Sequence, residues 1–133
     1  RNDEDIIDYL QENALVCMQE KAILLHGDFH LGNLLVAPDG KLRVIDFNRM
    51  KPGPAALEFA RMEMYSRHLA PEFCDAAQQA YFENEKLELW KSKVDFFAVF
   101  EGFFNVPWSL VYGKEATENA VKMLQKVWKH VRR

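Results

Sequence analysis

The chain has 133 residues, a length typical of one domain rather than two. Hydrophobic residues make up 49% and charged residues 28% of it, as in an ordinary globular protein. The net charge of -3 is not that of a nucleic-acid-binding protein, so we expect no nucleic-acid partner. The polar start RNDEDIIDYL is unlike a signal peptide, and because Arg1 stands in place of Met we expect a fragment of a longer protein.

The apolar pattern also argues against a membrane protein. The most apolar stretch, residues 94–113, is interrupted by Asp95, Glu101 and Pro107, so we expect a buried helix and no membrane partner. The two cysteines lie in helix-like patterns without the spacing of a metal or redox motif. We therefore expect buried, reduced thiols and a cytoplasmic location.

In chain order, the pattern predicts a helix, a small β element and then several helices. Apolar residues recur at helical spacing over about residues 4–19, and a short buried strand is predicted at 22–25. Segments 33–37 and 41–47 are predicted to form a hairpin, because Pro38-Asp39-Gly40 between them is a turn signal. Further helices are predicted at 54–69, 70–84, 86–106 and 115–133. This order predicts an α+β fold that is mostly α.

The stretch from Leu24 to Phe47 places several ionisable groups among apolar residues. Asp28 and Asn33 lie five residues apart, which is the spacing of the catalytic Asp and the metal-binding Asn in the protein-kinase catalytic loop. Phosphoryl transfer needs a carboxylate that orients the attacking hydroxyl and oxygen ligands that hold Mg²⁺. The spacing therefore favours a phosphate-transfer site.

Asp46 is the third candidate. If the hairpin turns at Asp39 and Gly40, Asn33 and Asp46 face each other across its open end. A bulged loop would shift this pairing by one residue and still leave both groups at the same end. Asp28 lies just upstream, so one local segment supplies all three oxygen-bearing side chains.

The motif HGDFHLGNLL, followed by VIDF, resembles the aminoglycoside phosphotransferase and choline kinase-like family, which is related to the protein kinases. The sequence matches every motif position of that family over Leu24 to Phe47. The resemblance implies the C-terminal lobe of a kinase-like fold with a small catalytic hairpin, formed by residues 1–133 as a single domain. No glycine-rich loop precedes Leu24, so we expect the N-terminal nucleotide-binding lobe to be absent from this chain.

The resemblance also implies roles for individual residues. Asp28 would be the catalytic base, and His30 would lie beside the transferred phosphate. Asn33 and Asp46 would bind Mg²⁺. His26 would brace the loop and belong with Asn33 and Asp46 to the cofactor-binding group. The implied cofactors are Mg²⁺ and ATP or GTP, and the implied partners are a small-molecule hydroxyl acceptor and the missing N-terminal lobe.

The chain departs from the family pattern after the hairpin. Glu58 stands where the family usually has Asp, and we expect it to brace the catalytic loop from the following helix. Gly27 and Gly32 are expected to let the loop turn tightly. Acidic side chains would suit a cationic acceptor, although an ordinary acidic surface explains them equally well: Glu58, Glu63, Glu83, Glu85 and Glu101.

Two other functions stay open at this point. The absent lobe and Glu58 are compatible with an inactive kinase-like scaffold, although an intact set of Asp28, Asn33 and Asp46 argues against it. His26, Asp28 and His30 alternate, so on a strand they would share a face and form the metal cluster of a phosphoesterase. Gly27 between them weakens a regular strand there.

Overall fold

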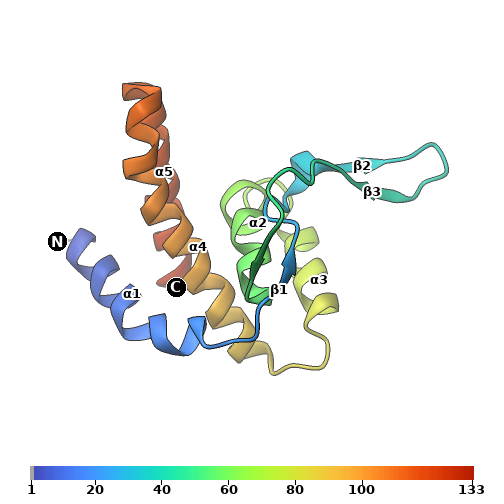
Figure 1. Ribbon diagram of the computed structural model, residues 1–133, viewed down its shortest axis with the longest axis horizontal. Coiled ribbons are helices and arrows are strands. Elements are labelled where there is room, and N and C mark those ends of the chain that lie inside the picture. The colour runs from blue at the N-terminus through green and yellow to red at the C-terminus, as the bar shows by residue number, and fades with distance from the viewer. Residues whose placement is uncertain (1) are drawn as a thin grey trace.

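The computed structural model describes residues 2–133, which fold into a helical body with a projecting hairpin (Figure 1). The α-helices are α1 (Asn2–Met18), α2 (Ala60–Tyr65), α3 (Pro71–Tyr81), α4 (Leu87–Ser109) and α5 (Lys114–Val131). The strands are β1 (Ile23–Leu25), β2 (Leu34–Val36), β3 (Leu42–Val44) and β4 (Lys51–Gly53). Short 3₁₀ helices are η1 (Leu31–Asn33), η2 (Ala55–Phe59) and η3 (Leu110–Tyr112). The mostly helical α+β prediction is confirmed.

Helix α4 is the centre of the body, because it contacts α1, α2, α5 and η2. Its side chains Val94, Phe96 and Val99 are almost fully buried. Helix α5 packs directly against α4 at Gly102, where a Cβ would make an ordinary van der Waals contact with the Leu124 side chain at 3.4 Å. The predicted buried thiols are confirmed, since both cysteines are free and buried.

By length and composition alone, Leu87–Tyr112 is the one segment of residues 2–133 that could cross a membrane. The central position of α4 in the helical body is an equally good explanation of why this segment is so apolar. The helix continues through Pro107 and ends at Ser109, whereas the sequence predicted an end near Pro107. The Ser109 hydroxyl donates a hydrogen bond to the Val106 carbonyl in this last turn.

The predicted helix at 54–69 is shorter than expected. Residues 55–59 form the 3₁₀ helix η2, and only Ala60–Tyr65 is α-helical. The sequence also missed β4, which pairs antiparallel with β1. Its sequence, Lys-Pro-Gly, lacks strand propensity, and Pro is tolerated there because the sheet has only two strands.

The hairpin is confirmed, and its register is the shifted one. Leu34 pairs with Val44 and Val36 with Leu42, so the backbone N–H of Ile45, rather than Asp46, bonds the Asn33 carbonyl at 2.9 Å. Gly40 takes a left-handed conformation (φ +78°) in the three-residue loop, as the turn chemistry predicts.

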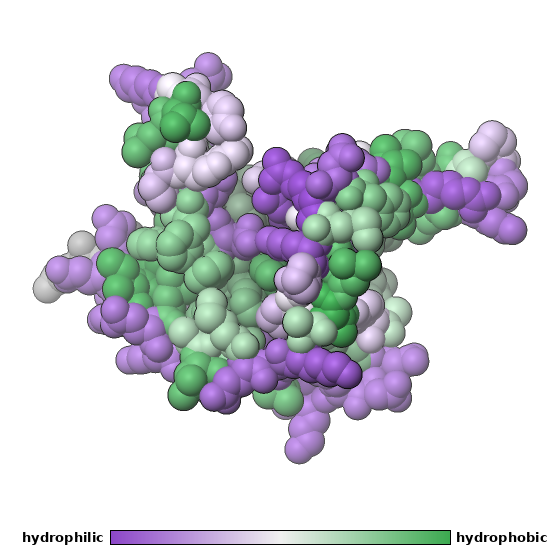
Figure 2. Space-filling view, viewed as in Figure 1, coloured by the Kyte–Doolittle hydropathy of each residue, from purple (hydrophilic) through white to green (hydrophobic). Residues whose placement is uncertain are grey.

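The prediction of a buried first strand is wrong for two of its three residues. Leu25 is buried, but Ile23 and Leu24 are exposed. The β2–β3 hairpin likewise exposes Leu35, Val36, Leu42 and Val44. Figure 2 shows hydrophobic residues along this arm. The hairpin forms its own two-stranded sheet, separate from the β1–β4 sheet in residues 2–133. A sheet of two strands leaves its apolar side chains exposed unless another layer covers them.

Asp95 gives the body a pH-dependent stability. Burial, and next the nearby Glu63 carboxylate, raise the pKa of Asp95 from 3.8 to about 6. The folded state therefore holds a proton that the unfolded chain releases between these values, so stability falls as the pH rises through this window. Above it, the ionised carboxylate costs up to about 3 kcal/mol.

We expect Asp95→Asn to stabilise the chain by roughly 1–2 kcal/mol at pH 7.5 and to change little at pH 4. Urea unfolding at both pH values measures this difference. Asp8→Asn, at an exposed position on α1, is the control for removing one surface carboxylate. A stabilisation of the same size at pH 4, or a loss of stability at pH 7.5, would contradict the assignment.

Candidate functional site

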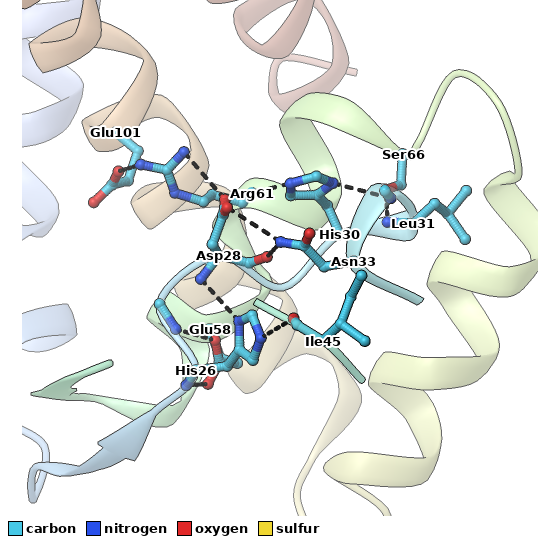
Figure 3. A network of polar contacts seen from close by, with 12 residues as sticks. His26, Asp28, His30, Leu31, Asn33, Ile45, Glu58, Arg61, Ser66 and Glu101 are labelled. Atoms are coloured by element: carbon cyan, nitrogen blue, oxygen red, sulfur yellow. Dashed lines mark hydrogen bonds and ion pairs between the residues drawn. The ribbon is translucent and has the colours of Figure 1, made fainter. Parts of the chain in front are cut away.

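The loop from His26 to Asn33 leaves β1 and enters the hairpin, and Glu58 on η2 braces it (Figure 3). Glu58 accepts hydrogen bonds from the backbone N–H of His26 (2.6 Å) and of Gly27 (3.0 Å). Gly27 has φ +84°, and a Cβ there would lie 1.9 Å from the Arg49 carbonyl oxygen. The expectation that Glu58 braces the loop is confirmed, so its extra methylene does not prevent this contact.

His26 joins the loop to the end of β3. Its Nδ1 accepts the N–H of Asp28 at 3.2 Å, and its Nε2 lies 2.9 Å from the Ile45 carbonyl oxygen. With Nδ1 as acceptor, Nε2 carries the proton and donates to Ile45. The Phe47 ring packs against the imidazole in an edge-to-face arrangement, with the ring centroids 4.6 Å apart. Both ring nitrogens are thus engaged within the chain, which is the arrangement of a bracing residue.

Asp28 is the centre of the polar network in Figure 3. Its Oδ2 accepts a hydrogen bond from the Asn33 amide at 3.1 Å. Its Oδ1 lies 3.3 Å from the His30 Nε2 and 3.5 Å from an Arg61 guanidinium nitrogen. The side chain keeps 17% of its surface exposed. Asp28 is therefore held on three sides while a solvent-facing edge stays open.

His30 fixes the Asp28 carboxylate from the hairpin side. Its Nδ1 accepts the Gly32 N–H at 3.1 Å and caps η1, so the proton sits on the Nε2 that faces Asp28. The ring tilts against Tyr65 at 5.6 Å. A Cβ on Gly32 would lie 2.7 Å from the His30 ring. Gly32 therefore leaves room for the imidazole. Its contacts do not support the expectation that Gly32 permits a tight turn.

Asn33 and Asp46 are the expected metal ligands. The Asn33 amide nitrogen donates to the Asp28 carbonyl (2.8 Å) and carboxylate, which leaves its amide oxygen for another partner. Asp46 follows the Asn33–Ile45 backbone pair and is exposed, with φ +62°. Non-glycine residues rarely adopt this conformation, and such strain recurs at functional sites. An amide oxygen and a carboxylate fit the ligand preference of Mg²⁺.

The metal cluster of a phosphoesterase has less support. Over residues 2–133, no three His, Cys, Asp or Glu side chains are grouped to hold a metal ion. The ring nitrogens of His26 and His30 are all engaged with partners in the chain. The alternation of His26, Asp28 and His30 therefore reflects a braced loop rather than the face of a strand.

Sequence reasoning missed the contribution of α2 and α4. Arg61 on α2 bridges Asp28 and Glu101, with a guanidinium nitrogen 3.8 Å from the Glu101 carboxylate. Ser66, just after α2, accepts the Leu31 N–H at 2.9 Å. These residues carry no local motif, because their partners are distant in sequence. Only the docking of α2 and α4 against the loop brings them into the site.

The fold and the site define a class. A braced loop that places Asp28 beside Asn33 at the entrance of a hairpin, mounted on a helical body, is part of a kinase-like fold.

The chain belongs to the phosphotransferase enzyme family (APH), whose sequence profile matches residues 2–90. A solved structure of a thermostable mutant of the aminoglycoside phosphotransferase APH(4)-Ia, in its apo form, is 26% identical, with a TM-score of 0.66. It matches 96% of this chain and 42% of its own. The ethanolamine kinase of Plasmodium vivax shares the fold at 16% identity and a TM-score of 0.61, over 93% of this chain and 39% of its own.

A search of curated proteins found no match. The chain spans about two fifths of the length of the two solved relatives.

Proposed function

We propose that the chain is the C-terminal lobe of a longer enzyme that moves the γ-phosphate of ATP or GTP to a hydroxyl of a small molecule. The observation that carries this proposal is the hydrogen bond between Asn33 and Asp28 in a braced loop, with Asp46 one residue beyond the Asn33–Ile45 pair. Family membership and the two kinase-like relatives support it.

Asp28 would orient the acceptor hydroxyl and accept its proton. The Asn33 amide donates to Oδ2, while His30 and Arg61 lie 3.3 Å and 3.5 Å from Oδ1. The side chain also keeps 17% of its surface exposed, so an acceptor hydroxyl can reach the carboxylate. The three contacts hold Asp28 in one orientation, so catalysis would come from positioning rather than from covalent chemistry.

Asn33 and Asp46 would hold Mg²⁺ through the amide oxygen and the carboxylate. When bound, the ion neutralises charge on the nucleotide phosphates. Asn33 would serve two purposes at once, because its amide nitrogen is fixed on Asp28 while its oxygen stays available. His30 would lie beside the transferred group, since its ring contacts the Asp28 carboxylate.

The N-terminal lobe would cover the exposed hairpin. Three exposed hydrophobic side chains share one face of the hairpin, namely Val36, Leu42 and Val44, and Leu35 is exposed on the opposite face beside Arg43. An exposed apolar face of this kind is typical of an interface. The solved relatives are more than twice as long as the part that this chain matches, which leaves room for such a lobe in the intact protein.

Phosphorus NMR on the intact protein tests the proposal. With Mg·ATP and a mixture of hydroxyl compounds, we expect ADP and a new phosphomonoester resonance, both abolished by EDTA. Nucleotide binding without any phosphomonoester would indicate the inactive scaffold. Hydrolysis of p-nitrophenyl phosphate in the absence of nucleotide would indicate a phosphoesterase instead.

A further inference from the structure

We infer that the acceptor of this site carries an anionic group, a carboxylate or a phosphate, that binds Arg49 in the cavity next to Asp28. The inference rests on the proposed phosphotransfer function and names the class of its acceptor. It differs from the cationic acceptor that acidic residues in the sequence would suit.

The cavity has a volume of about 410 Å³ and lies beside the catalytic loop. Its lining includes Arg49, Arg61, Tyr65, Glu101, Phe104 and Trp108. Arg61 joins it to the site, because the same guanidinium contacts the Asp28 carboxylate at 3.5 Å. A hydroxyl compound in this cavity would therefore contact the same Arg61 side chain that holds Asp28, the residue proposed to orient the hydroxyl.

The carboxylates around this cavity are already paired. The Glu101 carboxylate lies 3.8 Å from the Arg61 guanidinium and 3.7 Å from the Lys51 amino group. The Asp28 carboxylate contacts the same Arg61 guanidinium. Arg49, in contrast, makes no ion pair with any residue from 2 to 133. The charge left over in the lining is thus positive, and an anionic group would complement it.

The other acidic candidates do not serve a cationic acceptor either. Glu58 accepts two backbone N–H groups of the catalytic loop. Glu63 is buried and bonds Arg67 and Gln78. Glu83 and Glu85 do not line this cavity. A polyamine would find no unpaired carboxylate among the lining residues, and it would face the Arg49 guanidinium.

The cavity also offers flat apolar surfaces. Trp108 and Phe104 keep about half of their surface exposed (55% and 54%), and both line the cavity. Exposed aromatic faces stack on rings and on the apolar faces of sugars. The acceptor class is therefore a ring-bearing hydroxyl compound with one carboxylate or phosphate.

Three methyl glycosides that differ in charge test the inference by ligand-observed NMR on the intact protein, which includes the N-terminal lobe. The probes are methyl glucoside, methyl glucuronide and methyl glucosaminide, which are neutral, anionic and cationic. We expect the glucuronide to bind roughly tenfold more tightly than the glucoside, and the glucosaminide to bind most weakly. Arg49→Gln should abolish the preference, whereas Lys122→Gln, at an exposed position on α5, should preserve it.

Tightest binding of the glucosaminide, an unchanged preference in Arg49→Gln, or no saturable binding of any glycoside would overturn the inference. Titration of Mg·ATP into the same samples separates this failure from that of the proposed function. Nucleotide binding together with a missing glucuronide preference would reject only the acceptor class. Absence of nucleotide binding would count against the phosphotransfer site itself.

Discussion

Asp28→Asn in the intact enzyme is expected to lower turnover by about 10²–10⁴-fold while Mg·ATP affinity changes only a few-fold. The amide keeps the size of the side chain but cannot accept the proton of the acceptor hydroxyl. Asn33 and Asp46, the proposed metal ligands, stay in place. Initial rates of ADP formation and calorimetric titration of Mg·ATP measure the two effects separately.

Asp39→Asn is the matched control for this substitution. Asp39 lies in the hairpin turn, is exposed, and pairs with Arg43 and the Lys41 N–H. We expect it to leave turnover within about twofold, because such surface pairs contribute little. Unchanged turnover in Asp28→Asn would refute the assignment of the base. Loss of turnover together with nucleotide affinity would indicate a collapsed loop instead.

Gly27→Ala is expected to destabilise the fold by about 3 kcal/mol or more. A Cβ at this position would lie 1.9 Å from the Arg49 carbonyl oxygen, and the backbone has φ +84°. The carbonyl belongs to the main chain, so relief requires the loop after β3 to move. Urea unfolding monitored by circular dichroism measures the loss.

Gly40→Ala separates the steric contact from the backbone conformation. Gly40 also has a positive φ (+78°), but a Cβ there would meet no atom within 4 Å. We expect a loss of only about 1 kcal/mol. Equal losses for the two variants would show that the conformation alone, and not the contact with Arg49, makes Gly27 necessary.

The local part of the site was predictable because its information is local. The five-residue spacing of Asp28 and Asn33 and the Pro-Asp-Gly turn together placed the loop and the hairpin. The turn chemistry left two pairings open, and the structure has the shifted one, in which a three-residue loop ends in a left-handed glycine and Ile45 pairs with Asn33.

The tertiary part of the site was not predictable. Arg61 reaches Asp28, and Glu101 reaches Arg61, only because α2 and α4 pack beside the loop. Strand β4 was missed because its pairing with β1 overrides the poor strand propensity of Pro52 and Gly53. Periodicity reports which face of an element is buried, but not which partner it meets.

Calorimetric titration of Mg·ATP into the intact protein and into its Asp46→Gly variant tests the central claim most directly. Glycine removes the carboxylate and tolerates the φ of +62°, so the backbone is not strained by the change. With both proteins shown to be folded, we predict binding that weakens by roughly 30-fold or more in the variant. Equal affinity in the two proteins, or no binding by the folded wild type, would contradict a phosphotransfer site built on Asp28, Asn33 and Asp46.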